Sequence, residues 1–295
     1  QDWGATFIEG FELPENTLGD LREDSIMKGK LLAPIGGHWG SFGPWDDIDL
    51  VARPTQFLAD VAVETSMQNH TLTIRGVVDG TPAPARVEAS VRDAGGNVLS
   101  LPPVTVPATG MWVMETAIPD AIRWWSPEDP SLYELVLTLV SPAGATGNLD
   151  EQRLRIGFRE LWTDGPDFYL NGVKRHLLAS SGWPVAGDQP RAEIRQAIRQ
   201  LKQANCVAFR LHTQPWQRRW LEVADEEGLM IVEEGALWCD GAGTYAYRDP
   251  RLWENIKAHI AGMIRRDRNH ASLVMWSIEN EILHCGASRY DPDVE

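Results

Sequence analysis

Between Phe57 and Phe158 the chain alternates apolar and polar residues in short runs, which is typical of strands with one buried face. In the run Tyr133 to Val140, YELVLTLV, all three leucines fall on the same face. Turn-forming residues such as Asp93-Ala94-Gly95-Gly96-Asn97 separate the runs. The pattern predicts an immunoglobulin-like β-sandwich, for which about seven strands are usual. The predicted strands are LADVAVET, HTLTIRGVV, ARVEASVRD, MWVMETAI, YELVLTLV and LRIGF.

After Glu160 the pattern changes to strands that alternate with helices, which favours a parallel sheet. Gly228 is suited to end the second helix in a left-handed conformation, and Asp249-Pro250 is suited to begin the third. Four such strands predict the first half of a (β/α)8 TIM barrel. The predicted strands are RHLLAS (Arg175 to Ser180), CVAFRLH, LMIVEEGALW and SLVMWSIENE, and the predicted helices are a segment from Arg191, WQRRWLEVADEEG and a segment from Pro250.

Residues 1–54 are rich in Gly, Pro and Trp and contain only short strand-like pieces, such as WDDIDLVA from Trp45 to Ala52. This part is too short and irregular to close a core by itself. The sequence therefore predicts a multi-domain β and α/β protein in three parts, which span residues 1–54, 55–158 and 159–295.

Composition narrows the possible partners. The formal net charge is -15 and no cluster of Lys and Arg forms a basic stripe, which argues against nucleic acid as a binding partner. No apolar run approaches the ~20 residues of a membrane span, and the first residues do not resemble a signal peptide. We expect a soluble protein with no membrane partner, and the sequence does not fix its compartment.

Two residue types could carry chemistry or only fill cores. The 3 cysteines have neither CxxC nor metal-ligand spacing, so we expect no disulfide framework and no metal. The 13 tryptophans could stack on the apolar faces of sugars, but Trp also anchors ordinary cores.

Polar residues stand at the ends of the predicted barrel strands, where barrels place their chemistry. Arg210 and His212 end the second strand, Glu233 and Glu234 end the third, and Glu279-Asn280-Glu281 ends the fourth. Strand ends are also common places for structural salt bridges and helix caps. Position alone therefore leaves both interpretations open.

Several motifs resemble glycoside hydrolase family 2, which contains β-galactosidases, β-glucuronidases and β-mannosidases. MWSIENE is similar to the family's MWSLGNE, and the similarity extends over RRDRNHASLVMWSIENE (Arg265 to Glu281). RWWSPEDPSLYEL resembles its sandwich domain, and RIGFREL followed by FYLNGVKRHLLAS resembles its passage into the barrel. GPWDDIDLVARP (Gly43 to Pro54) is similar to the last strand of its N-terminal sugar-binding jelly roll.

The resemblance implies a retaining, exo-acting β-glycosidase that needs no cofactor and takes a carbohydrate substrate. Glu281 corresponds to the general acid/base, and Asn280 to the amide that binds the hydroxyl next to the anomeric carbon. Arg210 corresponds to the arginine that supports the nucleophile. Glu234 occupies the acid position at the end of the third strand, and we group it with the substrate-binding residues.

The chain departs from the family pattern in three places. The family often has a His where this chain has Thr213, and His212 stands one position earlier; we retain His212 as a substrate contact. The segment EEGALWCDGAG lacks the His of the β-galactosidase magnesium run, so the resemblance supports neither a metal nor galactose specificity. Glu279 replaces a small Gly and either adds a charge beside Glu281 or forms a salt bridge outside the barrel.

The family's nucleophile is a second Glu on a later strand, and a complete barrel takes ~250 residues. We therefore expect this chain to be a piece of a longer enzyme and to be inactive alone. Its expected partner is the missing half of the barrel, or else further copies of the same chain in a homo-oligomer. Two alternatives stay open: a non-catalytic carbohydrate-binding or assembly module, and a nucleophile supplied by a separate polypeptide.

Overall fold

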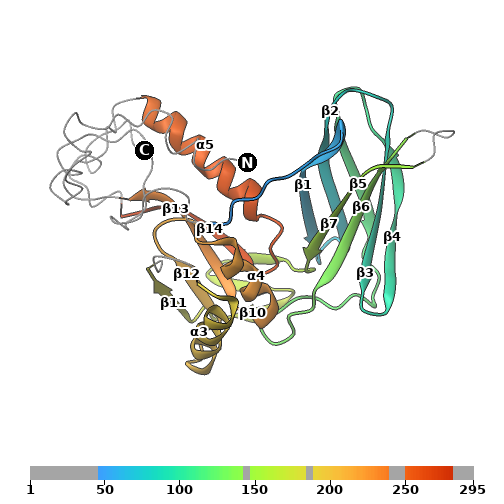
Figure 1. Cartoon of the computed structure of the whole chain (residues 1–295). Helices are drawn as coiled ribbons and strands as arrows, with labels where there is room; N and C mark the ends of the chain where they lie inside the picture. Colours follow the sequence, from blue (N-terminus) through green and yellow to red (C-terminus); the bar gives the residue numbers. More distant parts are fainter. Residues whose placement is uncertain (1–45, 142–146, 184–188, 239–249, 282–295) are drawn as a thin grey trace, which may run out of the picture.

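The structure is a computed structural model that describes residues 46–141, 147–183, 189–238 and 250–281. It consists of a β-sandwich beside a parallel sheet covered by helices, as Figure 1 shows. No helix in these ranges is long and apolar enough to span a membrane. The predicted jelly-roll segment before residue 46 and the residues around Asp249 lie outside the described residues.

The sandwich packs a three-stranded sheet, order β1-β2-β5, against a four-stranded sheet, order β4-β3-β6-β7. All pairs within these sheets are antiparallel. Their facing side chains form one apolar core, in which Leu135, Leu137 and Leu139 are fully buried as the alternation predicts. The strands are β1 (Gln56–Ser66), β2 (Thr71–Gly80), β3 (Arg86–Asp93), β4 (Gly96–Thr105), β5 (Met111–Ala117), β6 (Tyr133–Val140) and β7 (Asn148–Ile156).

Strand β4 was not predicted from the sequence, because it contains Pro102 and Pro103, which usually argue against a strand. The structure places β4 at the edge of its sheet, where one side of the strand needs no hydrogen-bonding partner. The turn at Asp93 to Asn97 does join β3 to β4, and Asp93 Oδ1 accepts a hydrogen bond from Gly95 N at 2.7 Å.

A small antiparallel sheet, order β10-β9-β8, connects the sandwich to the barrel strands. Its strands are β8 (Leu161–Asp164), β9 (Asp167–Leu170) and β10 (Val173–Arg175). The predicted strand Arg175 to Ser180 is therefore wrong in its position: Arg175 ends β10, and the first parallel strand is β11 (Ala179–Gly182). The apolar run misled the prediction because Leu178 is 60% exposed between these two strands.

The parallel sheet has the order β11-β12-β13-β14, which is the order along the chain. Its remaining strands are β12 (Ala208–Leu211), β13 (Met230–Trp238) and β14 (Leu273–Asn280). Helices α3 (Arg191–Gln203), α4 (Arg218–Glu227) and α5 (Pro250–Asp267) connect the strands. Gly228 ends α4 with φ 71, as predicted, and a Cβ there would lie 2.6 Å from Pro127 O.

One face of this sheet packs against the helices through apolar residues that include Ile198, Phe209, Trp220 and Ile231. The opposite face contacts a second cluster with Trp125, Leu170 and Met230. The sheet is therefore covered on its helix side, and its other side is covered only at the amino-terminal end of the strands among the described residues.

Residues 46–55 form no strand, so the strand predicted at Trp45 to Ala52 is wrong for its described part. A strand needs a neighbouring strand, and this segment instead runs from the barrel part toward β1, as the blue trace in Figure 1 shows. Its acids contact the barrel. Asp46 Oδ2 accepts a hydrogen bond from Arg218 N at 3.1 Å, and Asp47 pairs with Arg219 at 2.7 Å.

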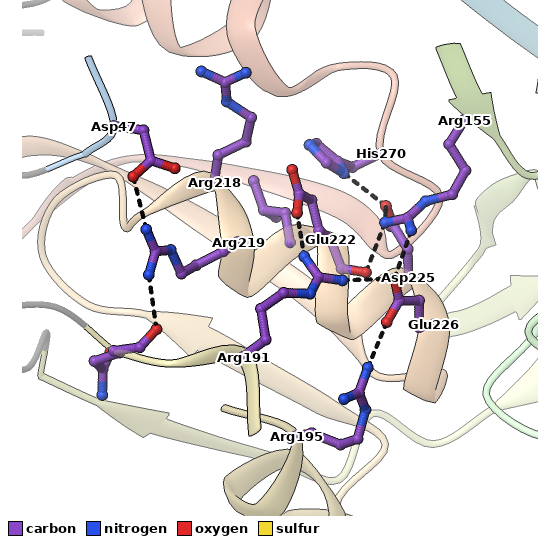
Figure 2. A network of polar contacts seen from close by, with 12 residues as sticks. Asp47, Arg155, Arg191, Arg195, Arg218, Arg219, Glu222, Asp225, Glu226 and His270 are labelled. Carbon is purple, nitrogen blue, oxygen red and sulfur yellow. Dashed lines mark hydrogen bonds and ion pairs between the residues drawn. The ribbon is translucent and has the colours of Figure 1, made fainter. Parts of the chain in front are cut away.

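The sandwich is joined to the barrel part by buried packing and by ion pairs. Trp125 is fully buried, and its Nε1 donates to Asp225 O at 2.9 Å. Figure 2 shows Arg155 of β7 reaching Asp225 and Glu226 of α4, beside the pair that His270 makes with Asp225 at 2.6 Å. Burial of one large side chain contributes about 1.5 to 3 kcal/mol, against about 0 to 1 for a solvent-exposed ion pair. Packing around Trp125 therefore contributes more to this junction than the partly exposed pair of Arg155 with Glu226.

Candidate active site

The carboxyl-terminal halves of β12, β13 and β14 bring together the polar residues that the sequence singles out. Strand β13 continues to Trp238, so the prediction that Glu233 and Glu234 end this strand is wrong. The three strands are parallel, with Leu211 opposite Glu233 and Glu234 opposite Ser277. Because side chains alternate between the two faces of a strand, Glu233 and Glu234 point to opposite sides of the sheet. The two acids are adjacent in β13, but they therefore have different surroundings and different roles.

Glu234 lies at the centre of a polar network on the face away from the helices. Its carboxylate is fully buried and accepts from Arg210 Nε at 2.7 Å and from Ser277 Oγ at 2.6 Å. The other carboxylate oxygen lies 3.1 Å from His212 Nδ1. A buried carboxylate is stabilised when a cation and several donors surround it, so this acid is held rigidly.

Arg210 connects Glu234 to the end of β14. Its Nη2 donates to Asn280 Oδ1 at 2.7 Å. Because this contact occupies the amide oxygen of Asn280, the amide nitrogen of that side chain is left as its donor group. The Asn280 side chain is buried and therefore has a fixed orientation.

His212 is a neutral imidazole that donates to Glu234 in this network. Burial lowers the pKa of His212 below its ordinary value of 6.5, and the charge of Arg210 acts in the same direction against the opposing carboxylates of Glu234 and Glu281. Nδ1 faces the Glu234 carboxylate, so it carries the ring proton, and Nε2 has a free lone pair. Nε2 of His212 is therefore suited to accept a hydrogen bond from a hydroxyl group.

Glu281 follows directly after β14 with φ 56, and its side chain is exposed in the described structure. Its charge acts on His212, so the two groups share one rim of the sheet. The structure thus brings Arg210, His212, Glu234 and Asn280 into direct contact and places Glu281 next to them. Glu279 is half-buried in β14, and its carbonyl oxygen accepts from Ser277 Oγ at 3.3 Å.

Glu233 points toward the helix layer and belongs to a different cluster. It is fully buried beside Arg266 of α5, which donates to Glu233 Oε1 at 3.2 Å and to both oxygens of Asp267. Asp46 lies 3.5 Å from the same guanidinium. Burial raises the pKa of Glu233 well above 4.5, and the charge of Asp267 adds to this, while Arg266 opposes it.

The substitution Glu233→Gln is expected to stabilise the protein relative to the wild type as pH rises from 4.5 to 8. A carboxyl with a raised pKa contributes its full stability below its unfolded value of 4.5 and loses it as pH rises through the folded value. Gln does not titrate, so the difference grows by up to about 1.4 kcal/mol per pH unit between the two values. Thermal unfolding of both proteins between pH 4.5 and 8 measures this difference.

Glu234→Gln is the matched control. It makes the same change at the next residue of β13, whose carboxylate is paired with Arg210. It is expected to destabilise the protein at pH 8 by removing the charge partner of Arg210. A loss of stability at pH 8 in Glu233→Gln as well would contradict the raised pKa of Glu233.

Two residues at this site were missed in the sequence. Ser277 donates to Glu234, and its only signal was its place inside MWSIENE. Trp183 follows β11 directly, and its ring lies 4.3 Å from the His212 ring at 81°. Residues at the ends of barrel strands are the candidates for chemistry, and this criterion could have identified Trp183. It did not, because the sequence predicts that the first strand ends at Ser180.

Within the described ranges, no group of three or more His, Cys, Asp or Glu side chains is arranged to hold a metal ion. The Glu234 carboxylate is instead occupied by Arg210, Ser277 and His212. The arrangement offers one exposed carboxylate, a fixed amide and a neutral imidazole at one rim, which suits acid/base chemistry on a substrate with several hydroxyl groups.

Two family models match the chain in succession. The model described as "Glycosyl hydrolases family 2" matches residues 56–159, and "Glycosyl hydrolases family 2, TIM barrel domain" matches residues 154–291. A β-galactosidase of Alteromonas mediterranea is 27% identical over 271 residues, which are 83% of this chain and 25% of that protein. The chain thus spans about a quarter of the length of the curated relatives it matches.

Solved structures agree with these matches. A β-glucuronidase from Ruminococcus gnavus, in complex with C6-substituted uronic isofagomine, has a TM-score of 0.61 and 25% identity; the match covers 77% of this chain and 38% of that chain. A family 2 member from Bacteroides cellulosilyticus has a TM-score of 0.65 and 21% identity, over 77% of this chain and 31% of that chain, and supports the fold.

Proposed function

Because the chain belongs to glycosyl hydrolase family 2, we propose that it forms part of a retaining, exo-acting β-glycosidase that hydrolyses terminal β-linked sugars. The observation that carries this proposal is the network of Glu234, Arg210 and Asn280 at the strand ends, with Glu281 directly after it. The β-galactosidase and β-glucuronidase names of its relatives support a sugar substrate.

Glu281 is the proposed general acid/base. A retaining glycosidase protonates the leaving oxygen with one carboxyl group and attacks the anomeric carbon with a second, ~5 to 5.5 Å away. Glu281 is the carboxylate at this rim that is exposed to an incoming substrate, whereas Glu234 is buried under three donors. Proton transfer from a positioned group of this kind contributes about 10² to 10⁴ in rate.

Asn280 is the proposed partner of the sugar hydroxyl next to the anomeric carbon. Arg210 holds its amide oxygen, so the amide NH₂ can donate to that hydroxyl. Such a bond strengthens as positive charge develops on the sugar, which favours the transition state over the ground state. His212 Nε2 is the proposed acceptor for a further hydroxyl, and Glu234 fixes its tautomer and position.

We assign the nucleophile to a barrel strand outside the described residues. Glu234 already accepts hydrogen bonds from Arg210, Ser277 and His212, which suits a supporting role better than attack on carbon. Strands β11 and β14 each have one neighbour among the described strands of their sheet, so each offers an edge for further barrel strands. Completion by the rest of the barrel is our leading proposal for the partner, and a homo-oligomer is the alternative.

The full-length protein that contains this chain is expected to release nitrophenol from at least one of the p-nitrophenyl β-galactoside, β-glucuronide, β-glucoside and β-mannoside. The matching α-glycosides serve as controls and are expected to stay intact. NMR of the first product is expected to show the β-anomer, because two displacements retain the configuration. No release from any β-glycoside, or an α-anomer as the first product, would contradict the proposal.

A further inference from the structure

Trp183 stands at the rim of the candidate site without a role in the network described above. It follows Gly182, the last residue of β11, which lies opposite Leu211 of β12 in the parallel register. A Cβ at Gly182 would lie 2.8 Å from Phe209 Cζ, so this glycine allows the strand end to pack closely and fixes where Trp183 begins. The Trp183 ring therefore lies beside His212 at the same edge of the sheet.

The exposure of Trp183 is unusual among the described residues. Its side chain is 51% exposed, and it is the one aromatic residue among the large apolar side chains that are strongly exposed in the described ranges. Trp112, Trp125, Trp216 and Trp220 are all buried in cores. A ring that leaves half its surface open contributes little to the core, so its open surface calls for another explanation.

We propose that Trp183 is the stacking platform for the apolar C–H face of the terminal sugar, and so a specificity-determining residue of this site. An indole ring is flat, apolar and rigid, and it packs well against the C–H groups of a pyranose. His212 Nε2, in the ring that Trp183 contacts, provides an acceptor for a hydroxyl of the same sugar. The inference rests on the proposed glycosidase function.

The order of the strands indicates which end of the sugar Trp183 contacts. Asn280 ends β14 and Glu281 follows it, His212 follows β12, and Trp183 follows β11, the strand at the opposite edge of the sheet from β14. If Glu281 acts at the anomeric carbon, Trp183 lies toward the part of the terminal sugar that is remote from the cleaved bond. Trp183 therefore distinguishes sugars by the shape of that remote part, where galactose differs from glucose at C4 and glucuronic acid differs at C6.

The test compares Trp183→Ala and Trp183→Phe with the wild type in the full-length protein. The Ala variant is expected to raise KM and lower kcat/KM by roughly tenfold to a hundredfold, because about half an indole face loses its contact. The Phe variant is expected to recover most of this loss. The inhibition constant for the δ-lactone of the preferred sugar is expected to change in parallel with KM.

Trp162→Ala is the matched control, because Trp162 stacks on Tyr169 at 5.8 Å in the β8–β9 pair, outside the site. It is expected to leave kcat/KM unchanged. If Trp183→Ala matched Trp162→Ala in KM and lactone inhibition, the proposal would be wrong. A Phe variant as impaired as the Ala variant, with a lowered melting temperature in both, would show a structural role instead.

The failure of this inference is distinguishable from the failure of the proposed function. Absence of any β-glycosidase activity in the wild-type protein would contradict the proposed function. Calorimetry with methyl β-glycosides would still compare sugar binding by the wild type and Trp183→Ala. Equal binding by both proteins would overturn the platform, and weaker binding by the Ala variant would support it.

Discussion

Replacing Glu281 by Gln in the full-length protein is expected to lower kcat by about 10² to 10⁴ on glycosides with poor leaving groups. Gln cannot protonate the departing oxygen, and it cannot later activate water to release the sugar from the enzyme. The loss in the first step is expected to shrink on dinitrophenyl glycosides, because their leaving group departs without a proton. Steady-state and burst-phase kinetics on a series of leaving groups measure this dependence.

Glu279→Gln is the matched control for this prediction. It removes the neighbouring carboxylate from the same strand and keeps Asn280 and Glu281. We expect its kcat to show the same dependence on leaving group as the wild type. Unchanged turnover of an ordinary glycoside by Glu281→Gln would remove Glu281 from the mechanism, and the acid would then have to be sought among other carboxylates of the full-length protein.

Replacing Arg210 by Met is expected to have the largest effect on stability among these variants. Glu234 is fully buried, and without the guanidinium its charge loses its cation. Breaking a buried ion pair on one side costs about 3 to 5 kcal/mol. Because the Arg210 side chain is 34% exposed and water can partly replace it, we expect about 3 kcal/mol. Denaturant unfolding at pH 7 measures the loss.

Activity is expected to fall in Arg210→Met as well, because Asn280 loses the contact that orients its amide. Adding Glu234→Gln to Arg210→Met is expected to restore part of the stability, since no buried charge is then left alone, but not the activity. Arg199→Met is the control: its ion pair with Glu227 is solvent-exposed, and its loss is expected to cost under about 1 kcal/mol. Equal losses in Arg210→Met and Arg199→Met would show that the Glu234 site tolerates its charge without Arg210.

Local sequence patterns predict most of the elements of this protein. Alternation identifies the strands of the sandwich, such as β6 with its buried leucines, and helical periodicity identifies α3, which begins at Arg191 as predicted. Two of the failures have a common cause. β4 contains prolines that only an edge position tolerates, and β11 is short and follows an apolar run that is not a strand. In both cases the neighbours of the segment, and not its own residues, decide the outcome.

The sequence by itself determined which residues stand at strand ends, and its motifs already singled out Arg210, His212, Glu234, Asn280 and Glu281. Strand position alone could not separate Glu233 from Glu234, because adjacent residues of a strand differ in role only once a helix layer covers one face of the sheet. Only the tertiary structure paired Glu233 with Arg266 and Glu234 with Arg210. It also placed Trp183 beside His212, since contacts between strands distant in sequence depend on the parallel register and not on either segment alone.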